Sequence, residues 1–268
     1  MNNLDVQKEK LFIIKIGGNV IDDPDQIVSF LTAFSKIKEK KILVHGGGKI
    51  ATAIGEKLGI HSNYIDGRRI TDDETIDLVT MVYGGLVNKK IVARLQSMDC
   101  NAIGISGADA NLLPAKKRPV KEIDYGWVGD IEDSIHSQTW ELFLENGLTP
   151  VVAPLTHDNN GHLLNTNADT IASLIAANLS AYYETTLIYC FEKNGVLLNV
   201  ADENSIVKNL DKKKYQQLKE SKSLFAGILP KIDNAFEAIH KGVKEVVIGN
   251  SAHLSLLINN ESGTKISL

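Results

Sequence analysis

Short apolar runs alternate along this chain with longer stretches of helical periodicity. The apolar runs predict strands at residues 11–16, 41–45, 102–106, 149–153, 186–189 and 245–248. The periodic stretches predict helices at residues 25–39, 50–58, 72–98, 169–179 and 231–241. The first two strands each run into glycines and then into a helix. This repeated unit predicts an α/β fold, with a mainly parallel open sheet between two layers of helices.

Two segments stand out from this alternation. Thr71 and Glu74 have the spacing of a capping box, which predicts Thr71 as the N-cap of a helix running to about residue 98. Such a helix is about 40 Å long, so its apolar stripe must be buried across the whole domain or against another subunit. The stripe consists of Ile76, Val79, Tyr83, Leu86, Ile91 and Leu95. Residues 108–135 are rich in Lys, Pro, Gly and Asp, which predicts loops or hairpins.

Composition narrows the class of protein. The 268 residues are 43% hydrophobic and 23% charged, with a net charge of −4. This excludes general disorder and gives no basic surplus for binding nucleic acid. No run reaches the roughly 18 apolar residues that span a bilayer, and the first ten residues lack a signal-peptide core. Two cysteines make neither a disulfide framework nor a four-thiolate zinc site. We therefore expect a cytoplasmic protein that binds neither nucleic acid nor membrane.

Two glycine-rich turns follow the first two predicted strands, at residues 17–18 and 46–48. Glycine lets backbone N–H groups approach a ligand, and the helix that follows adds the positive end of its dipole. A tight turn alone explains Gly17 and Gly18, whereas three consecutive glycines are harder to explain in that way. The spacing matches neither the dinucleotide fingerprint nor the P-loop. The turns therefore predict a cradle for phosphate or carboxylate oxygens.

Two lysines occupy unusual places. Lys15 lies inside an otherwise apolar strand, two residues before the glycines, where an unpaired ammonium group is costly to bury. Lys231 opens a predicted helix, and a lysine at a helix N-terminus is unfavourable unless an anion lies nearby. A solvated edge position is the alternative for Lys15. We favour cations directed at anionic oxygens at the carboxyl end of the sheet.

Further polar residues precede two of the predicted helices. Asn165, Asn167 and Asp169 alternate, so an extended segment would place all three side chains on one face. Helix capping explains one of them but not all three. Arg69 could bind a carboxylate in a fork, although a surface arginine is the simplest interpretation of this residue alone. The seven histidines show no metal-ligand spacing, and no nucleophile has a base beside it.

Taken together, these segments resemble the acetylglutamate kinases of the amino acid kinase superfamily, over nearly the whole chain. The resemblance is carried by IKIGG at 14–18, VHGGG at 44–48, DGRRIT at 66–71, VNK at 87–89, VGD at 128–130, LNTNAD at 164–169 and GILPK at 227–231. It implies a three-layer α/β/α sandwich, the amino acid kinase fold. Residues 1–175 would form the lobe for acyl-amino-acid binding and dimerisation, and residues 176–268 the nucleotide-binding lobe.

The resemblance also implies a reaction, the ATP-dependent phosphorylation of the γ-carboxylate of N-acetyl-L-glutamate in the second step of arginine biosynthesis. Lys15 and Lys231 would stabilise the transferring phosphoryl group, and Asp169 would orient both lysines. Phosphate oxygens would bind the backbone N–H groups of Gly17 and Gly18. The acyl-amino acid would be bound by Gly47, Gly48, Arg69, Asn165 and Asn167. The nucleotide, with Mg²⁺ on its phosphates and no metal ligand from the protein, would contact Glu192, Gly195, Val196, Leu197, Ser223, Leu224 and Phe225.

One departure from the family bears on the substrate. Arg68 stands where many relatives have an apolar residue beside the substrate-binding arginine. This second cation is either solvated or meets an additional carboxylate, such as the one that N-succinyl-L-glutamate carries. Succinyl is therefore the alternative to acetyl as the acyl group. Residues 189–195 and 225–227 also depart from the usual pattern around the nucleotide.

Other functions on the same fold remain alternatives. Kinases for carbamate, aspartate, glutamate or UMP share the lysines and glycines, but the pair Arg69 and Asn165 argues against carbamate, which has no second carboxylate. A non-catalytic binding or regulatory protein is the alternative from another class, and intact Lys15, Asp169 and Lys231 argue against it. The short lead before Lys15 predicts a homodimer without arginine feedback, with the helix that begins at Asp72 as its main interface by resemblance.

Overall fold

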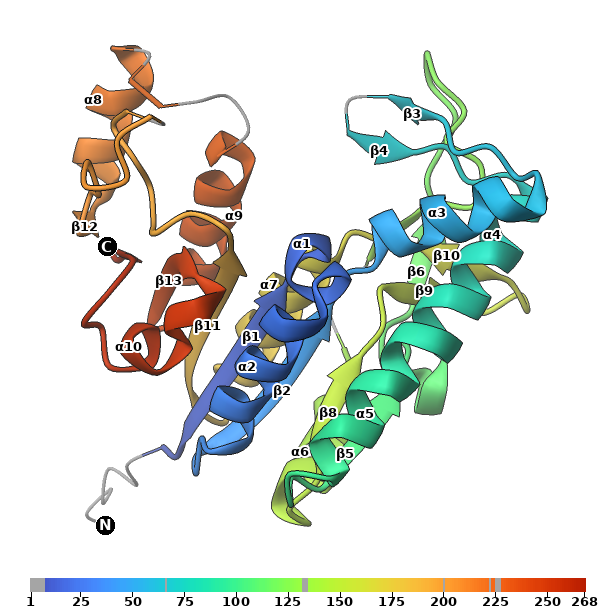
Figure 1. Ribbon diagram of the computed structural model, residues 1–268, viewed down its shortest axis with the longest axis horizontal. Helices are drawn as coiled ribbons and strands as arrows, with labels where there is room; N and C mark the ends of the chain where they lie inside the picture. The colour runs from blue at the N-terminus through green and yellow to red at the C-terminus, as the bar shows by residue number, and fades with distance from the viewer. Residues whose placement is uncertain (1–7, 66, 132–134, 200, 222, 225–227) are drawn as a thin grey trace, which may run out of the picture.

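An eight-stranded open sheet forms the centre of the computed structural model, which describes residues 8–65, 67–131, 135–199, 201–221, 223–224 and 228–268 (Figure 1). The paired strands are parallel except β14, which is antiparallel to β13. In sheet order the strands are β12 (Asn209–Leu210), β14 (Thr264–Ile266), β13 (Glu245–Asn250), β11 (Glu184–Phe191), β1 (Lys10–Ile16), β2 (Lys40–His45), β8 (Thr149–Val152) and β5 (Ala102–Ile105).

Helices cover both faces of this sheet. Along β1, Leu11 and Ile13 belong to one apolar cluster and Phe12 and Ile14 to another, as the alternation of a strand requires. The first cluster includes residues of α6 (Ser137–Glu145), α7 (Ala168–Leu179), α8 (Lys212–Glu220) and α9 (Leu229–His240). The second includes residues of α1 (Gly18–Asp22), α2 (Pro24–Ser35), α3 (Gly48–Leu58), α4 (Asp73–Val79), η1 (Thr80–Val87), α5 (Asn88–Gln96) and α10 (Leu254–Ile258). The predicted three-layer α/β/α sandwich is confirmed.

Three hairpins project beside the carboxyl ends of the central strands. They are β3 (Tyr64–Ile65) with β4 (Arg68–Arg69), β6 (Ala115–Lys117) with β7 (Gly129–Ile131), and β9 (Leu155–His157) with β10 (Leu163–Asn165). The hairpin of β6 and β7, together with the short helix η2 (Asp109–Asn111), confirms the predicted loops or hairpins for the described part of residues 108–135. Several short elements were not predicted from the sequence. They are the hairpins β3–β4 and β9–β10, the elements β12, α8, α10 and β14, and the short helix η4 (Ser251–His253). The predicted helix 25–39 ends four residues early, at Ser35.

The N-cap of the long helix is not the predicted one. Asp72 caps α4, because its carboxylate accepts the backbone N–H of Thr75 at 2.9 Å. Thr71 is fully buried instead, and its hydroxyl donates to the carbonyl of Arg69 at 3.1 Å and accepts from the side-chain amide of Asn165 at 3.0 Å. Both residue types are good N-caps, so the tertiary contact with Asn165 decides between them.

The long helix is confirmed as one helical run from residue 73 to 96, divided into α4, the π-helical segment η1, and α5. Val79, Tyr83, Ile91 and Leu95 of its apolar stripe are buried, whereas Leu86 is exposed. The four buried residues belong to the cluster that lies between the sheet and α2. The helix therefore buries its stripe across its own domain.

The glycine turn after β2 is held in place by a buried histidine. The Nδ1–H of His45 donates to the carbonyl of Gly46 at 2.7 Å, and Nε2 accepts from the Asn88 amide at 3.1 Å. Asn88 also donates to the carbonyl of Val151 at 2.9 Å. Burial lowers the pKa of His45 to about 4, against a smaller opposite effect of the Gly46 carbonyl, and the charge of Lys89 lowers it further. The ring is therefore neutral at pH 7.

This histidine makes stability depend on pH. Because its pKa is about 4 in the folded chain and about 6.5 when unfolded, the unfolded state binds the extra proton first as the pH falls. The stabilisation is complete above pH 6.5 and decreases toward pH 4, by up to about 3 kcal/mol. We expect His45→Gln to lose this part of the pH dependence of the free energy of unfolding, measured in urea. The exposed His61, changed to Gln, is the control, and parallel profiles for wild type and His45→Gln would contradict the prediction.

Helical glycines offer a second test of the packing. A Cβ on Gly55 in α3 would lie 2.7 Å from the carbonyl oxygen of Ile60 and 2.8 Å from Leu78, whereas a Cβ on Gly85 in η1 would have no atom of another described residue within 4 Å. We expect Gly55→Ala to destabilise the chain by about 1–3 kcal/mol through overpacking. Gly85→Ala should stabilise it by about 0.5–1 kcal/mol, because alanine costs less backbone entropy in a helix. Unfolding in urea measures the free energy of unfolding of both variants. Equal changes for Gly55→Ala and Gly85→Ala would contradict the close packing of α3 on α4.

Candidate active site

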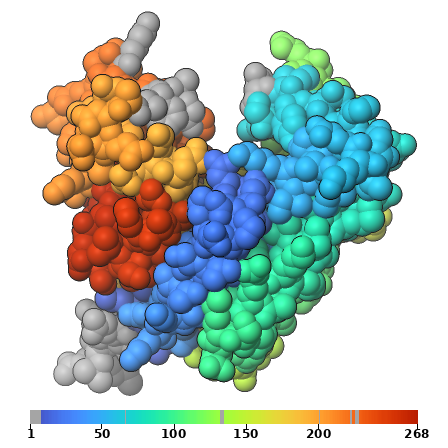
Figure 2. All heavy atoms as spheres, viewed as in Figure 1, coloured from blue at the N-terminus to red at the C-terminus, as the bar shows by residue number. Residues whose placement is uncertain are grey.

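The carboxyl ends of β1, β2 and β11 lie beside the first turn of α7, where ligands of open α/β sheets bind. Figure 2 shows the surface hollowed between the cyan N-terminal part and the orange C-terminal part of the chain. One cavity, of about 390 Å³, is lined by residues of the turn after β2 and of the hairpins. A smaller one, of about 240 Å³, lies beside the turn after β1.

Three charged residues that are distant in the sequence meet here. Lys15 shares a face of β1 with Leu11 and Ile13, which is the face covered by α7. Its Nζ lies 2.7 Å from Oδ1 of Asp169, in the first turn of α7. The Nζ of Lys231, in the first turn of α9, contacts Oδ2 of the same carboxylate. The structure thus brings together the three residues that the sequence predicted as one group.

The electrostatics of this group depend on burial. Burial by itself raises the pKa of Asp169, but the charges of Lys15 and Lys231 outweigh it and hold that pKa well below its usual range. Burial lowers the pKa of Lys231, and Lys15 lowers it further, while Asp169 acts in the opposite direction. Asp169 is therefore ionised at neutral pH, and each of its oxygens holds one lysine.

The polar residues before α7 have two kinds of contact. Asn167 is the N-cap of α7, because its side-chain oxygen accepts the backbone N–H groups of Asp169 at 2.8 Å and Thr170 at 3.1 Å. Asn165 donates from its amide to Thr71. Both asparagines also line the larger cavity. Asn167 is thus both the N-cap of α7 and part of the cavity wall.

Both predicted glycine turns line cavities. Gly47 and Gly48 line the larger cavity, and Gly17 and Gly18 the smaller one. Gly47 has a φ of +154°, and a Cβ on it would lie 3.0 Å from the ring of Tyr83. A side chain at this position would therefore be strained and would collide with η1.

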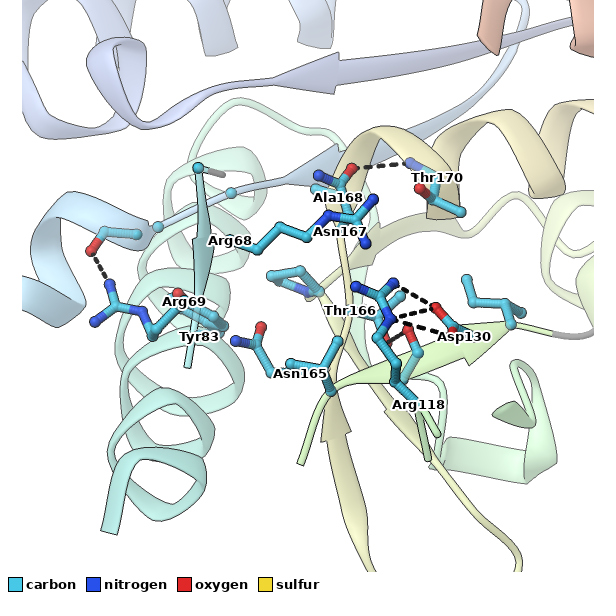
Figure 3. Close-up of a pocket in the computed structure, with 18 of the residues that line it drawn as sticks. Arg68, Arg69, Tyr83, Arg118, Asp130, Asn165, Thr166, Asn167, Ala168 and Thr170 are labelled. Carbon is cyan, nitrogen blue, oxygen red and sulfur yellow. Dashed lines mark hydrogen bonds and ion pairs between the residues drawn. The ribbon is translucent and has the colours of Figure 1, made fainter. Parts of the chain in front are cut away.

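The two adjacent arginines of β4 point in different directions (Figure 3). Arg69 is 6% exposed and points toward the start of α3, where it donates to the carbonyl of Gly48 at 2.8 Å and to Thr52 at 2.9 Å. Arg68 is exposed and points across the cavity toward Asn167. Within the part of the chain that the structure describes, the side chain of Arg68 makes no hydrogen bond or ion pair. Arg69 thus supports the glycine turn, and Arg68 brings a positive charge into the cavity.

The sequence did not identify several residues of the cavity wall. Arg118 in the β6–β7 hairpin donates from Nε to both carboxylate oxygens of Asp130 at 3.1 Å, and its Nη2 contacts the same group. Tyr83 and Thr170 also line the cavity. The only signal for Asp130 was the VGD segment at 128–130, and nothing in the sequence pairs it with Arg118.

The predicted nucleotide residues are spread over different environments. Glu192 lines the smaller cavity. Val196, Leu197 and Leu224 are buried, and the N–H of Val196 donates to Thr264 at 2.8 Å. Gly195 has a φ of +151° and packs on Thr264, while Ser223 is exposed. Phe225 lies outside the described residues.

Across the described ranges, no group of three or more His, Cys, Asp or Glu side chains is placed to hold a metal ion. The same residues include no helix long and apolar enough to cross a bilayer.

Comparisons with known proteins agree with this geometry. The model of the amino acid kinase family matches residues 10–250. The acetylglutamate kinase of Cytophaga hutchinsonii is 52% identical over 96% of this chain and 98% of its own length. That of Bacteroides thetaiotaomicron is 48% identical over 97% of this chain and 99% of its own length.

A solved structure supports the fold independently. Carbamate kinase from Giardia lamblia bound to AMP-PNP superposes with a TM-score of 0.71 and 14% identity, over 97% of this chain and 98% of that one. At this identity the likeness shows the fold alone. The family model and the two curated relatives go further: the chain belongs to the amino acid kinase family and, within it, to the acetylglutamate kinases.

Proposed function

We propose that this chain transfers the γ-phosphoryl group of ATP to the γ-carboxylate of N-acetyl-L-glutamate, the second step of arginine biosynthesis. The observation that carries the proposal is the half-buried Asp169, which holds Lys15 and Lys231 at the carboxyl end of the sheet. The relatives named acetylglutamate kinase support the choice of acceptor. The nucleotide-bound neighbour on the same fold supports the choice of donor.

The chemistry needs positive charge and positioning rather than a base. An oxygen of the acceptor carboxylate, already ionised at neutral pH, forms a bond to the γ-phosphorus. The bond from that phosphorus to the oxygen bridging the β-phosphorus breaks, and ADP leaves with the electron pair. Lys15 and Lys231 stabilise the charge on the phosphoryl oxygens. Asp169 keeps both ammonium groups in place and limits their mutual repulsion.

We assign the larger cavity to the acyl-amino acid and the smaller one to the phosphates of the nucleotide. In the proposal the acyl-amino acid occupies the larger cavity, with its γ-carboxylate on the N–H groups of Gly47 and Gly48 and its α-carboxylate near Arg69 and Asn165. Phosphates bind at Gly17 and Gly18. Mg²⁺ arrives on the phosphates of ATP, where it neutralises charge. Residues 1–175 thus serve as the acyl-amino-acid lobe and residues 176–268 as the nucleotide lobe.

The assembly that we propose is a homodimer through the long helix. Met81 and Leu86 of η1 are 56% and 37% exposed, so apolar side chains remain on its outer face after the inner stripe is buried. Two exposed apolar residues are a small part of an interface. The main support for the proposed homodimer is therefore the resemblance to the acetylglutamate kinases.

A second acyl group is supported by a specific observation. Arg68 points into the cavity without a partner among the described residues, beside the paired Arg118 and Asp130. A terminal carboxylate on the acyl chain, as in N-succinyl-L-glutamate, would give this guanidinium an anionic partner. N-succinyl-L-glutamate is therefore the second candidate substrate of the same reaction.

Removing one lysine tests the reaction. We expect Lys231→Met to lower kcat by about 100- to 1,000-fold, because one of two fixed cations is lost from the transition state. Acyl phosphate trapped with hydroxylamine measures the product. Lys212, also in the first turn of a helix but exposed, gives the control Lys212→Met. Unchanged transfer by Lys231→Met would rule out the proposed role.

Removing the exposed arginine tests the acyl group. We expect Arg68→Leu to lower kcat/KM for N-succinyl-L-glutamate by roughly 10- to 100-fold, the effect of losing one charge-assisted contact. The value for N-acetyl-L-glutamate should change less than about threefold. Arg94→Leu, at an exposed arginine of α5, is the control. If both substrates respond equally to Arg68→Leu, the arginine does not distinguish the acyl groups.

A further inference from the structure

A third lysine lies at the glycine turns. Lys49 is the second residue of α3, directly after the turn formed by residues 46–48. The N-terminus of a helix carries partial positive charge, so a lysine here is unfavourable unless an anion compensates it. No acidic residue stands in the first turn of α3 to do so. Lys49 therefore adds positive charge to a region that already holds a helix N-terminus.

Lys49 reaches toward the turn after β1. The ideal Cβ position of Gly18 lies 3.8 Å from Cγ of Lys49, while that of Gly17 lies 3.9 Å from Nζ of Lys15. The two glycines are thus flanked by two different lysines. Lys49, Gly17 and Gly18 line the same small cavity, together with Glu192.

The contacts of Lys49 differ from those of the other two lysines. Lys15 and Lys231 each form an ion pair with Asp169. The Nζ of Lys49 contacts the amide oxygen of Asn19 instead. Among the described residues, Lys49 forms no ion pair within 4 Å. A neutral amide is a weaker partner for an ammonium group than a carboxylate or a phosphate is.

The amide of Asn19 is itself held from the other side. Its nitrogen contacts a carboxylate oxygen of Glu192, the residue directly after β11. This fixes the orientation of the amide, with its oxygen directed to Lys49. The chain from Glu192 through Asn19 to Lys49 therefore positions an exposed ammonium group beside the phosphate cradle. The carboxylate of Asp22 acts on this charge electrostatically, but among the described residues it forms no ion pair with Lys49.

We propose that Lys49 is a phosphate-binding residue that contacts the β- and γ-phosphate oxygens of the nucleotide. This inference rests on the proposed function, because it assigns a further residue to the same site. The ammonium group exchanges the Asn19 oxygen for a phosphate oxygen, which is the stronger acceptor. Lys15 and Lys49 then bind the polyphosphate on either side of the turn formed by Gly17 and Gly18.

Nucleotide binding tests this role directly. We expect Lys49→Met to raise the Kd for AMP-PNP by about 10- to 100-fold, measured by calorimetry, since a charge-assisted contact is lost. Binding of AMP, which lacks the β- and γ-phosphates, should change less than about threefold. Lys49→Arg should restore most of the affinity, because it keeps the charge. A merely structural role for Lys49 would weaken both nucleotides alike and would overturn the proposal.

Controls separate this inference from the proposed function. Lys57, at the other end of α3 and also exposed, gives the matched variant Lys57→Met, which should bind AMP-PNP like the wild type. In the kinase assay Lys49→Met should raise KM for ATP and leave KM for the acyl-amino acid within about threefold. A wild-type chain that binds AMP-PNP but phosphorylates neither acyl-glutamate would overturn the proposed function alone. An unchanged AMP-PNP affinity in Lys49→Met, with active wild type, would overturn the inference alone.

Discussion

Asp169 holds Lys15 on one carboxylate oxygen and Lys231 on the other, at the carboxyl end of the sheet. A half-buried ammonium group or carboxylate is costly without a partner, so each of the three is stabilised in its place in the fold by the others. They come from β1, α7 and α9. The group therefore requires that the strand, the helix that crosses it and a helix from the last part of the chain converge at one point.

The other side of the site depends on neutral packing and hydrogen bonds. His45, Asn88 and Tyr83 hold the glycine turn after β2 from within the core, and Arg69 holds the start of α3. These side chains fix backbone N–H groups whose positions would otherwise be free to vary. A carboxylate acceptor needs such positioned donors more than it needs a catalytic base. Ion pairs thus position the side of the site at β1, and packing and hydrogen bonds position the side at the glycine turn after β2.

Local patterns predicted the fold better than the walls of the site. The apolar residues around Lys15 in β1 identified it as a cation that needs an anionic partner, and the structure supplies Asp169. The choice between Thr71 and Asp72 as N-cap could not be made locally, since it depends on Asn165, which is 94 residues away. The pair of Arg118 and Asp130 depends on the register of a hairpin within a segment of weak periodicity. Sequence reasoning fails where the deciding partner is distant in the chain.

The same ion pairs connect the two proposed lobes. Asp169 belongs to residues 1–175 and Lys231 to residues 176–268, and α7 and α9 share one apolar cluster. Any movement of the lobes that separated these helices would leave a half-buried carboxylate with one cation instead of two. That cost favours a rotation about the ion-pair group over a separation. The charge cluster that we propose for phosphoryl transfer therefore also lies where the two proposed lobes would pivot.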